Sequence, residues 1–447
     1  MLKSFNLITK DKIISFNKTI KVDPDKSISI RSFLLGSICQ NISYASNVLE
    51  SEDVLSTIIS LRKLGVTIKR KKTNDYIIYG KGLGSLISKK NSKINFGNSG
   101  TLARLLIGIL STTPRIELKI SGDHSLNKRS MKKLIQIMSR FGATFLPKNK
   151  FNFPLKLISS AMPIGIKYKS GISAQLKSAV ILAGLNSYGE TEIEELEQSR
   201  NHTENMLLNN SQTIKINKET KKIIKIQGKR FLNSFKINVP GDPSSAAFFT
   251  ALTLLNNNSS LKIKNVGLNK RRTGFYRLLK KHGANIKFAN QKKINNEIRG
   301  DITVVSSKLK PIKADKSFYA SSTDEYPILF VLAALTKGIS IFKGIDDLAN
   351  KESNRITEMK KVLSQIGIKS VSTKSELKIF GNEMLKVQKK IITIPNLGDH
   401  RICMSSFVLA ILTGAKAKIK NFETVFSSSP SFLKIMKSLG AKFEVQE

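Results

Sequence analysis

In this chain of 447 residues, two arginines each follow a small residue by four positions. Arg31 follows Ser27 by four residues, which would put both on one face of a helix. Arg104 follows Gly100 at the same spacing. Because arginine can grip a carboxylate or a phosphate through two parallel hydrogen bonds, we expect these positions to serve a small anionic ligand.

Two carboxylates accompany further cations in the second half of the chain. Glu352 stands between Lys351 and Arg355, and Asp324 lies in the preceding polar segment. A carboxylate held among cations can take up or deliver a proton in general acid–base catalysis. Surface ion pairs are the alternative, but the recurrence of such charged sites at five places favours a binding site.

Three further cations belong to the same pattern. Lys26 precedes Ser27, Arg129 closes a polar segment, and Arg401 follows His400. The segments around Lys26 and Arg401 open strongly apolar stretches that predict buried helices. A helix N-terminus attracts anions through its free N–H groups and its dipole. Several such termini would form a cleft for a multiply anionic small molecule.

The elements that must position these residues repeat six times. Each copy opens with small polar residues and continues as an apolar helix, and the copies begin near Ser27, Asn98, Ser173, Asp242, Asp324 and Asp399. Six units of about 75 residues account for the whole chain. Such residues are good helix N-caps, and at Asp242 we favour a cap alone, since no cation follows it directly.

A second pattern alternates with the first: the end of a helix, a glycine, and then a strand. The glycines are Gly65, Gly142, Gly283, Gly367 and Gly440, with a degenerate copy between 207 and 216. Glycine suits the left-handed turn that ends a helix, and the alternating apolar residues that follow predict strands. The chain should therefore fold as α/β units, three in each of two domains.

Charge and composition restrict the class of protein. The net charge of +43 suggests a nucleic acid or an anionic membrane as partner. The lysines, however, are scattered, without the aromatic–basic alternation that stacks bases, so a nucleic-acid binder is only the non-enzymatic alternative. No apolar run is long enough to span a membrane, and no signal peptide is evident, so we expect a cytoplasmic protein. Two cysteines and four dispersed histidines predict neither a disulfide framework nor a metal site.

Taken together, the polar segments resemble the EPSP synthase (3-phosphoshikimate 1-carboxyvinyltransferase) family, and its class II members most closely, over essentially the full chain. The segments are Asp25–Phe33, Asn95–Thr101, Ser173–Val180, Val239–Ser245, Asp324–Pro327 and Asp399–Arg401, and Lys351–Arg355 matches the family's K-E-x-x-R. The resemblance implies a monomer with a two-domain, inside-out α/β barrel fold. Each domain would contain three β-α-β-α-β-β units with buried helices.

The same resemblance implies the domain limits. Residues 20–235 would form the N-terminal domain, and residues 1–19 with 236–447 the C-terminal domain. A two-stranded hinge near residues 20 and 236 would let the domains close around the substrates.

The activity that the resemblance implies belongs to the shikimate pathway of aromatic amino-acid and chorismate biosynthesis. The 5-hydroxyl of shikimate 3-phosphate would attack C2 of phosphoenolpyruvate while C3 is protonated, and phosphate would then leave. Shikimate 3-phosphate would bind Lys26, Ser27, Arg31, Ser173, Ala174, Gln175, Asp324 and Lys351. Phosphoenolpyruvate would bind Lys26, Gly100, Arg129, Gln175, Arg355 and Arg401. Asp324, Glu352 and Lys26 would be catalytic, and neither a metal nor an organic cofactor would be needed.

Some positions depart from the family pattern. Asp23 and Pro24 replace the usual P-G before Lys26, Ile30 replaces a commonly polar residue, and 427–430 lacks a lysine found in many class I members. The sister enolpyruvyl transferase that acts on UDP-N-acetylglucosamine stays an alternative. That enzyme typically carries a loop cysteine in the second unit's active-site segment, whereas Cys39 and Cys403 are expected in apolar helices.

Overall fold

The computed structural model describes residues 4–89, 92–217, 222–385, 387 and 391–447. The chain forms two compact units. Unit 1 comprises Met1–Asp23, Pro240–Ile294 and Ile298–Glu447, and unit 2 comprises Pro24–Val239 and Asn295–Glu297. The chain therefore passes from one unit to the other after Asp23 and after Val239, a few residues beyond positions 20 and 236. Residues 1–3 of the expected C-terminal domain lie outside the described part.

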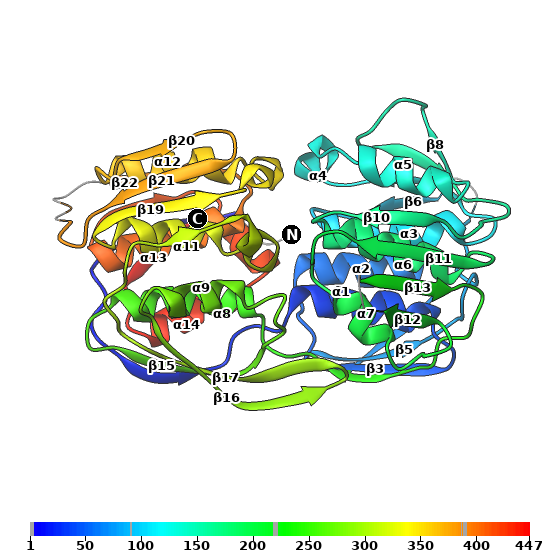
Figure 1. The fold of residues 1–447 in the computed structure, drawn as a ribbon, viewed down its shortest axis with the longest axis horizontal. Helices are drawn as coiled ribbons and strands as arrows, with labels where there is room; N and C mark the ends of the chain where they lie inside the picture. Colours follow the sequence, from blue (N-terminus) through cyan, green and yellow to red (C-terminus); the bar gives the residue numbers. More distant parts are fainter. Residues whose placement is uncertain (1–3, 90–91, 218–221, 386, 388–390) are drawn as a thin grey trace. The chain divides into compact units, whose positions relative to one another are not determined.

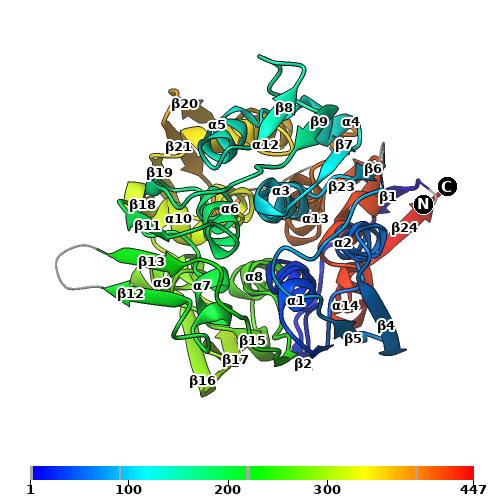
Figure 2. The ribbon, with the colours of Figure 1, turned by 90° about the vertical axis from the view of Figure 1, so that its right-hand side faces the viewer.

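Unit 2 has three buried helices surrounded by three four-stranded sheets, as Figure 2 shows. The helices are α1 (Lys26–Ile38), α3 (Gly100–Thr112) and α6 (Ala174–Leu185). The strand orders are β14-β3-β5-β4, β6-β7-β9-β8 and β10-β11-β13-β12. In each sheet the first two strands are parallel and the other neighbours antiparallel.

The remaining elements of unit 2 are short. Its strands are β3 (Ile42–Ser46), β4 (Thr67–Lys72), β5 (Asp75–Tyr79), β6 (Lys93–Asn95), β7 (Glu117–Ser121), β8 (Thr144–Leu146), β9 (Leu155–Ile158), β10 (Lys167–Ser170), β11 (Glu190–Glu195), β12 (Ile214–Asn217), β13 (Ile223–Gln227) and β14 (Lys236–Asn238). Its other helices are α2 (Glu52–Lys63), α4 (His124–Lys128), α5 (Lys132–Arg140) and α7 (His202–Leu207).

Unit 1 repeats this design around α8 (Pro243–Leu255), α11 (Tyr326–Ala334) and α13 (His400–Thr413). Its strand orders are β16-β17-β15-β2, β18-β19-β21-β20 and β22-β23-β1-β24. Figure 1 shows α8 and α11 between the sheet of β15 and β17 and that of β19 and β21. The helices are apolar on nearly every side, and such helices must be buried. In α11 every residue from Tyr326 to Ala334 is buried, as the sequence pattern predicts.

The other elements of unit 1 complete the three repeats. The strands are β1 (Asn6–Thr9), β2 (Asn17–Ile20), β15 (Ser260–Gly267), β16 (Asn285–Ile294), β17 (Glu297–Val305), β18 (Lys313–Ala314), β19 (Gly338–Lys343), β20 (Ser370–Ser372), β21 (Glu376–Gly381), β22 (Ile391–Ile394), β23 (Lys416–Ile419) and β24 (Phe443–Gln446). The helices are α9 (Gly274–Lys281), α10 (Tyr319–Ser322), α12 (Arg355–Gln365), α14 (Phe432–Ser438), η1 (Lys316–Phe318), η2 (Asp346–Asn350) and η3 (Phe422–Ser427).

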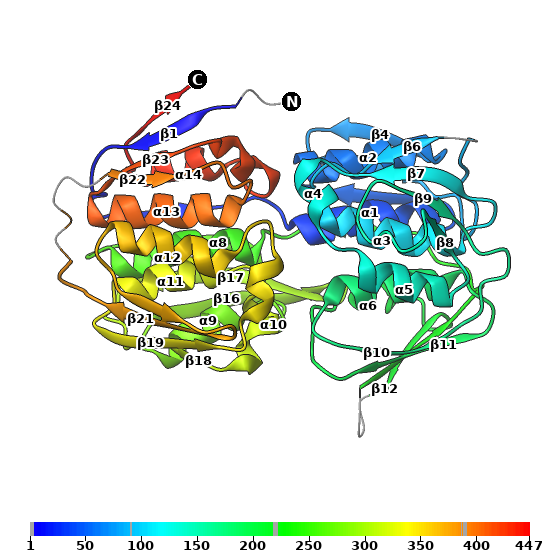
Figure 3. The same ribbon diagram turned by 90° about the horizontal axis from the view of Figure 1, so that it is seen from above.

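Three strands pair with a different repeat from the one that their position in the chain would suggest. β2 precedes α1 in the sequence but pairs with β15 in unit 1, and β14 precedes α8 but pairs with β3 in unit 2. β1 lies between β23 and β24, so the first and last strands are neighbours (Figure 3). A repeat unit of the fold is therefore not always one continuous piece of chain.

The glycine pattern is confirmed. All five glycines have the left-handed backbone that other residues rarely adopt, with φ between 83° and 98°. In each copy one residue separates the end of the helix from the glycine, and one or two residues separate the glycine from the next strand. This conformation reverses the chain so that each outer helix leads into its sheet.

The buried helices begin close to the predicted positions, with two corrections. The N-caps Ser99, Ser173, Asp242 and Asp399 accept hydrogen bonds from the first turns of their helices. In α1 the cap is Asp25, and Ser27 lies inside the helix. Asp324 caps no helix; it lies in the turn between α10 and α11, where the side chain of Glu325 makes no capping bond.

Candidate active site

The first two turns of α1 contain three of the predicted residues. Asp25 accepts a hydrogen bond from Ile28 N at 2.8 Å, which fixes the start of the helix. Lys26 Nζ lies 3.0 Å from the Asp53 carboxylate of α2. The Arg31 guanidinium donates to the carbonyl oxygen of Ser27 at 3.0 Å, so the predicted spacing does bring these two residues together. The start of α1 therefore carries one ammonium and one guanidinium group.

The starts of α3 and α6 are joined by hydrogen bonds. Arg104 donates through Nη1 to Gly100 O at 3.1 Å and to Gln175 Oε1 at 2.9 Å. Gln175 in turn donates to Thr101 Oγ1 at 3.0 Å. A Cβ added at Gly100 would lie 2.6 Å from Arg104 Nη1 and 3.3 Å from Arg129 Nη1. Two guanidinium groups thus lie against the bare backbone of Gly100.

Arg129 and Ser173 complete the predicted residues of unit 2. Arg129, at the end of α4, donates to Asn98 Oδ1 at 2.9 Å. Ser173 uses its hydroxyl to cap α6 by accepting from Leu176 N at 3.4 Å, and Ala174 is the first helical residue. The structure therefore gathers the unit 2 candidates around the polar starts of its buried helices.

Arg355 is the centre of the predicted cluster in unit 1. Its guanidinium is buried and lies 2.7 Å from Glu352, 3.0 Å from Asp399 and 3.8 Å from Asp324. Burial alone would lower the pKa of Arg355, but Asp399, Glu352 and Asp324 outweigh it and raise the pKa above its usual value. One permanent cation thus holds both candidate acid–base carboxylates.

Lys351 does not share a helix turn with Arg355, because it follows η2 while Arg355 opens α12. Its ammonium group instead pairs with Asp347 at 2.6 Å. Tyr319 donates its hydroxyl to the same carboxylate at 2.8 Å. Burial and the nearby Asp347 raise the pKa of Tyr319, so the phenol keeps its proton for this bond.

Arg401 lies in the first turn of α13. Its backbone N–H donates to Asp399 at 3.0 Å, and its guanidinium lies 5.7 Å from the ring centre of Phe248. Within the described residues, its buried Nη1 has no hydrogen-bond acceptor. Because buried N–H groups in proteins almost always meet an acceptor, we expect an anion or a water molecule there.

A cation also reaches the start of α8, where the sequence suggested only a cap. Arg272 donates to Asp242 and to Ser244 Oγ, each at 3.0 Å. Ser244 also contacts Glu325, the residue after Asp324. The sequence could not show this, because Arg272 comes from the segment before α9.

Two of the unusual sequence positions, Asp23 and the serine segment 427–430, meet in unit 1. The buried carboxylate of Asp23 accepts from Ser429 Oγ at 2.9 Å and from Ser431 N at 3.0 Å. Burial raises the pKa of Asp23, while these hydrogen bonds partly offset the effect. The unusual Asp23 and the unusual serine segment are therefore one structural feature.

Several partners of the predicted residues were missed. Arg104 was visible through its spacing from Gly100 but was not included in the site. Asp53 and Asp347 gave no signal, since a lone carboxylate on an outer helix is ordinary. Asp399 was seen only as a helix start, although it also orients Arg355.

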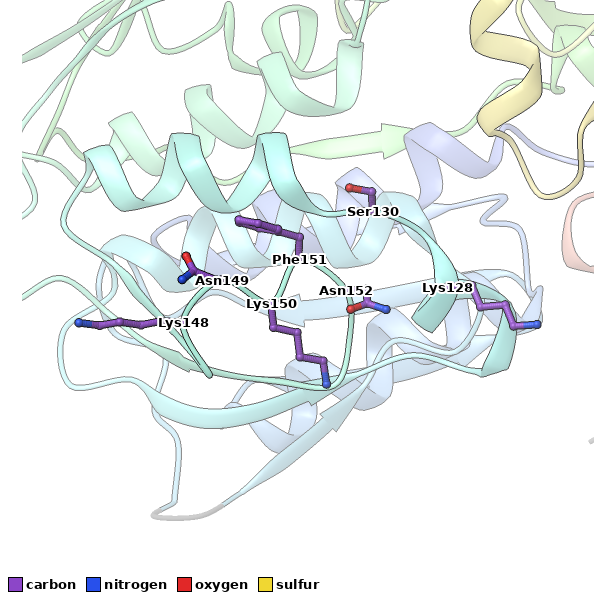
Figure 4. Close-up of a pocket in the computed structure, with 7 residues that line it drawn as sticks. All are labelled: Lys128, Ser130, Lys148, Asn149, Lys150, Phe151 and Asn152. Carbon is purple, nitrogen blue, oxygen red and sulfur yellow. The ribbon is translucent and has the colours of Figure 1, made fainter.

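A surface pocket adjoins the segment that holds Arg129. It is lined by Lys128, Ser130, Lys148, Asn149, Lys150, Phe151 and Asn152 (Figure 4). The three lysine side chains extend in different directions, so their ammonium groups do not converge on one ligand. We assign no function to this pocket.

Neither cysteine is placed for nucleophilic chemistry. Cys39 caps the C-terminus of α1 and Cys403 lies within α13, and both are buried. Burial raises the pKa of Cys39 to about 12 and that of Cys403 further, so neither thiol ionises near neutral pH. Cys39 thus follows α1 directly rather than lying within it.

No group of histidine, cysteine or acidic residues in the described ranges could hold a metal ion. No described helix is long and apolar enough to cross a membrane.

In each unit of this α/β fold, arginines lie beside the polar starts of buried helices, and in unit 1 Arg355 also contacts two carboxylates. This arrangement is typical of an enzyme that acts on small anionic substrates. Comparison with known proteins supports this. The family model for EPSP synthase (3-phosphoshikimate 1-carboxyvinyltransferase) matches residues 10–436. The chain belongs to the EPSP synthase family, and thus to the transferases.

Individual relatives agree with this membership. The chain is 36% identical over 424 residues to a 3-phosphoshikimate 1-carboxyvinyltransferase of Paramagnetospirillum magneticum, covering 94% of each protein. It is 39% identical over 416 residues to one from Thermoanaerobacter sp., covering 93% of this chain and 96% of the relative. A solved structure of EPSP synthase from Acinetobacter baumannii matches with a TM-score of 0.85 and 32% identity, covering 99% of this chain and 100% of the other.

Proposed function

We propose that this chain transfers the enolpyruvyl group of phosphoenolpyruvate to the 5-hydroxyl of shikimate 3-phosphate. The products are 5-enolpyruvylshikimate 3-phosphate and phosphate. Family membership over nearly the whole chain gives the reaction. The observation that carries the residue roles is the contact of Arg355 with Glu352 and, at longer range, with Asp324.

The two carboxylates divide the proton transfers. Asp324 takes the proton from the 5-hydroxyl, and Glu352 delivers a proton to the methylene carbon of phosphoenolpyruvate. The methyl group formed in this way loses a proton as phosphate leaves, which restores the carbon–carbon double bond of the product. Both carboxylates are partly exposed, so solvent can restore their protonation between turnovers. Arg355 positions both carboxylates, because its guanidinium group lies beside each of them.

Shikimate 3-phosphate is assigned to residues of both units. They are Lys26, Ser27, Arg31, Ser173, Ala174, Gln175, Asp324 and Lys351. The starts of α1 and α6 offer backbone N–H groups and helix dipoles, and Arg31 adds a guanidinium held at one helix face. These groups match an anion that carries a phosphate and a carboxylate.

Phosphoenolpyruvate is assigned to Lys26, Gly100, Arg129, Gln175, Arg355 and Arg401. Support comes from the guanidinium groups beside Gly100 and from the buried Nη1 of Arg401. The absence of a side chain at Gly100 lets a ligand approach the backbone. Cations held in place around the phosphate stabilise the negative charge that develops as the phosphate leaves, and these side chains do not have to move during the reaction. Lys26 contributes to the same stabilisation as one of these cations.

The protein works as a monomer in the cytoplasm, closes its units through a hinge near residues 20 and 236, and binds no nucleic acid or membrane. Many lysines are scattered and several pair with nearby carboxylates, as Lys225 does with Glu190 at 3.0 Å. Such a distribution gives a general positive field rather than a groove for a polyanion.

The decisive experiment measures phosphate release from phosphoenolpyruvate in the presence of shikimate 3-phosphate. We expect release only when both substrates are present, with no added metal or cofactor. UDP-N-acetylglucosamine in place of shikimate 3-phosphate is the control. Release with the sugar nucleotide alone would overturn the proposal, and salt-dependent binding to a generic DNA duplex would overturn the claim about nucleic acid.

A further inference from the structure

Arg31 is held by two hydroxyl groups that lie outside its own repeat. Thr203, on α7, accepts from Arg31 Nε at 2.8 Å. Ser178, on α6, accepts from Arg31 Nη2 at 3.2 Å and from the Thr203 hydroxyl at 2.8 Å. The two oxygens therefore fix one edge of the planar guanidinium group.

Helix α7 is anchored on both sides of Thr203. His202 Nδ1 lies 2.7 Å from Glu297, and Glu204 lies 2.7 Å from Lys177 Nζ. All four of these side chains are buried. A helix of six residues is not stable alone, so these contacts determine where Thr203 stands.

Helix α6 connects the two hydroxyl groups that hold Arg31 to the candidate site. Its first turn contains Gln175 and Lys177, and Ser178 follows directly. Lys177 is completely buried and also lies 2.6 Å from Glu195. Because a buried ammonium group is costly unless it is paired, the register between α6 and α7 is strongly fixed. The Thr203 and Ser178 hydroxyls are thereby set in place before any ligand binds.

We propose that Thr203 and Ser178 are positioning residues that orient the Arg31 guanidinium for shikimate 3-phosphate. The inference rests on the proposed function, which assigns Arg31 to this substrate. An arginine that is already oriented loses less conformational freedom when its anion binds. Removing a hydroxyl should therefore weaken binding of this substrate without changing the chemical step.

The first test replaces Thr203 by valine, which keeps the shape and removes the hydroxyl. We expect the KM for shikimate 3-phosphate to rise about ten-fold, as for loss of a hydrogen bond to a charged group, with kcat and the KM for phosphoenolpyruvate within about two-fold. Thr203→Ser should restore the parent value. The control is Thr191→Val, a buried threonine on β11 whose hydroxyl has no partner among the residues described.

The second test asks whether Thr203 acts through Arg31. Adding Thr203→Val to Arg31→Lys should change the KM for shikimate 3-phosphate by less than about two-fold, because residues in one network are not additive. Effects that multiply, or an unchanged KM in Thr203→Val, would overturn the inference. Should Thr203→Val not fold, Ser178→Ala takes its place in both tests. A parent protein that releases no phosphate would instead refute the proposed function.

Discussion

Glu352 lies 2.7 Å from Nη2 of Arg355, and the same guanidinium group donates to Asp399 through Nε at 3.0 Å and through Nη2 at 3.3 Å. The last residue of the K-E-x-x-R segment therefore fixes the position of its second residue. Arg355 opens α12 and Asp399 caps α13, so the geometry depends on two helices from different repeats. Substitution of Glu352 tests the chemical role of this carboxylate.

Glu352→Gln should lower kcat by about 10²–10⁴-fold, the usual contribution of a general acid or base. Binding of shikimate 3-phosphate, measured by calorimetry, should stay within a few-fold, because Glu352 acts on the other substrate. Glu358→Gln, on the same α12 but paired with Lys361, is the matched control and should leave kcat unchanged. Retention of more than about a tenth of the parent kcat would remove Glu352 from the proton transfer.

Arg129→Lys keeps the charge but loses the planar fork. The KM for phosphoenolpyruvate should therefore rise by at least about ten-fold, and that for shikimate 3-phosphate much less. Arg140→Lys, at the exposed end of α5, should change neither constant. Steady-state kinetics with each substrate varied in turn separates these outcomes. Equal increases in both Michaelis constants would mean that Arg129 orders the site as a whole.

Gly100→Ala should displace the two guanidinium groups beside it. The new Cβ would lie 2.6 Å from Arg104 Nη1, so that side chain must move, and 3.3 Å from Arg129. We expect the KM for phosphoenolpyruvate to rise by about ten-fold, since moving such a group costs the order of one hydrogen bond to a charge. Gly171→Ala is the control, because its Cβ would meet nothing within 4 Å. An unchanged KM in Gly100→Ala would place phosphoenolpyruvate elsewhere.

The buried pair of Glu195 and Lys177 should make the free energy of unfolding fall as the pH is lowered into the acid range. Burial opposes the charge of Glu195, but Lys177 and Lys222 outweigh it and lower its pKa to about 2 from 4.5. A carboxyl group with a lowered pKa stabilises the fold above its unfolded pKa, and this contribution is lost as the pH falls from about 4.5 to about 2. The contribution is on the order of 3 kcal/mol, at about 1.4 kcal/mol for each pKa unit.

Urea unfolding of the parent and of Glu195→Gln measures this effect. The difference in the free energy of unfolding should be several kcal/mol at pH 7, because the variant leaves Lys177 less well paired, and should shrink towards pH 2. The control Glu190→Gln removes an exposed pair on the same strand and should cost at most about 1 kcal/mol at any pH. A difference independent of pH would show that Glu195 is not ionised in the folded protein.

The amino-acid sequence by itself determined the local features of this protein. Buried helices follow from apolar residues on every face, and the turns at Gly65 and its four counterparts follow from the backbone freedom of glycine. The arginines, the carboxylates and the family resemblance were visible because each belongs to a short contiguous segment. These features depend only on neighbours in the chain.

Tertiary structure alone decided which distant residues meet. β2 and β14 exchange sheets because strand pairing depends on which edge is near in space, and chain order does not record this. Asp23 meets Ser429 across more than 400 residues, and Thr203 reaches Arg31 from another repeat. Hydrogen bonds and ion pairs act over a few ångströms, so the chain had to fold before these partners could be known.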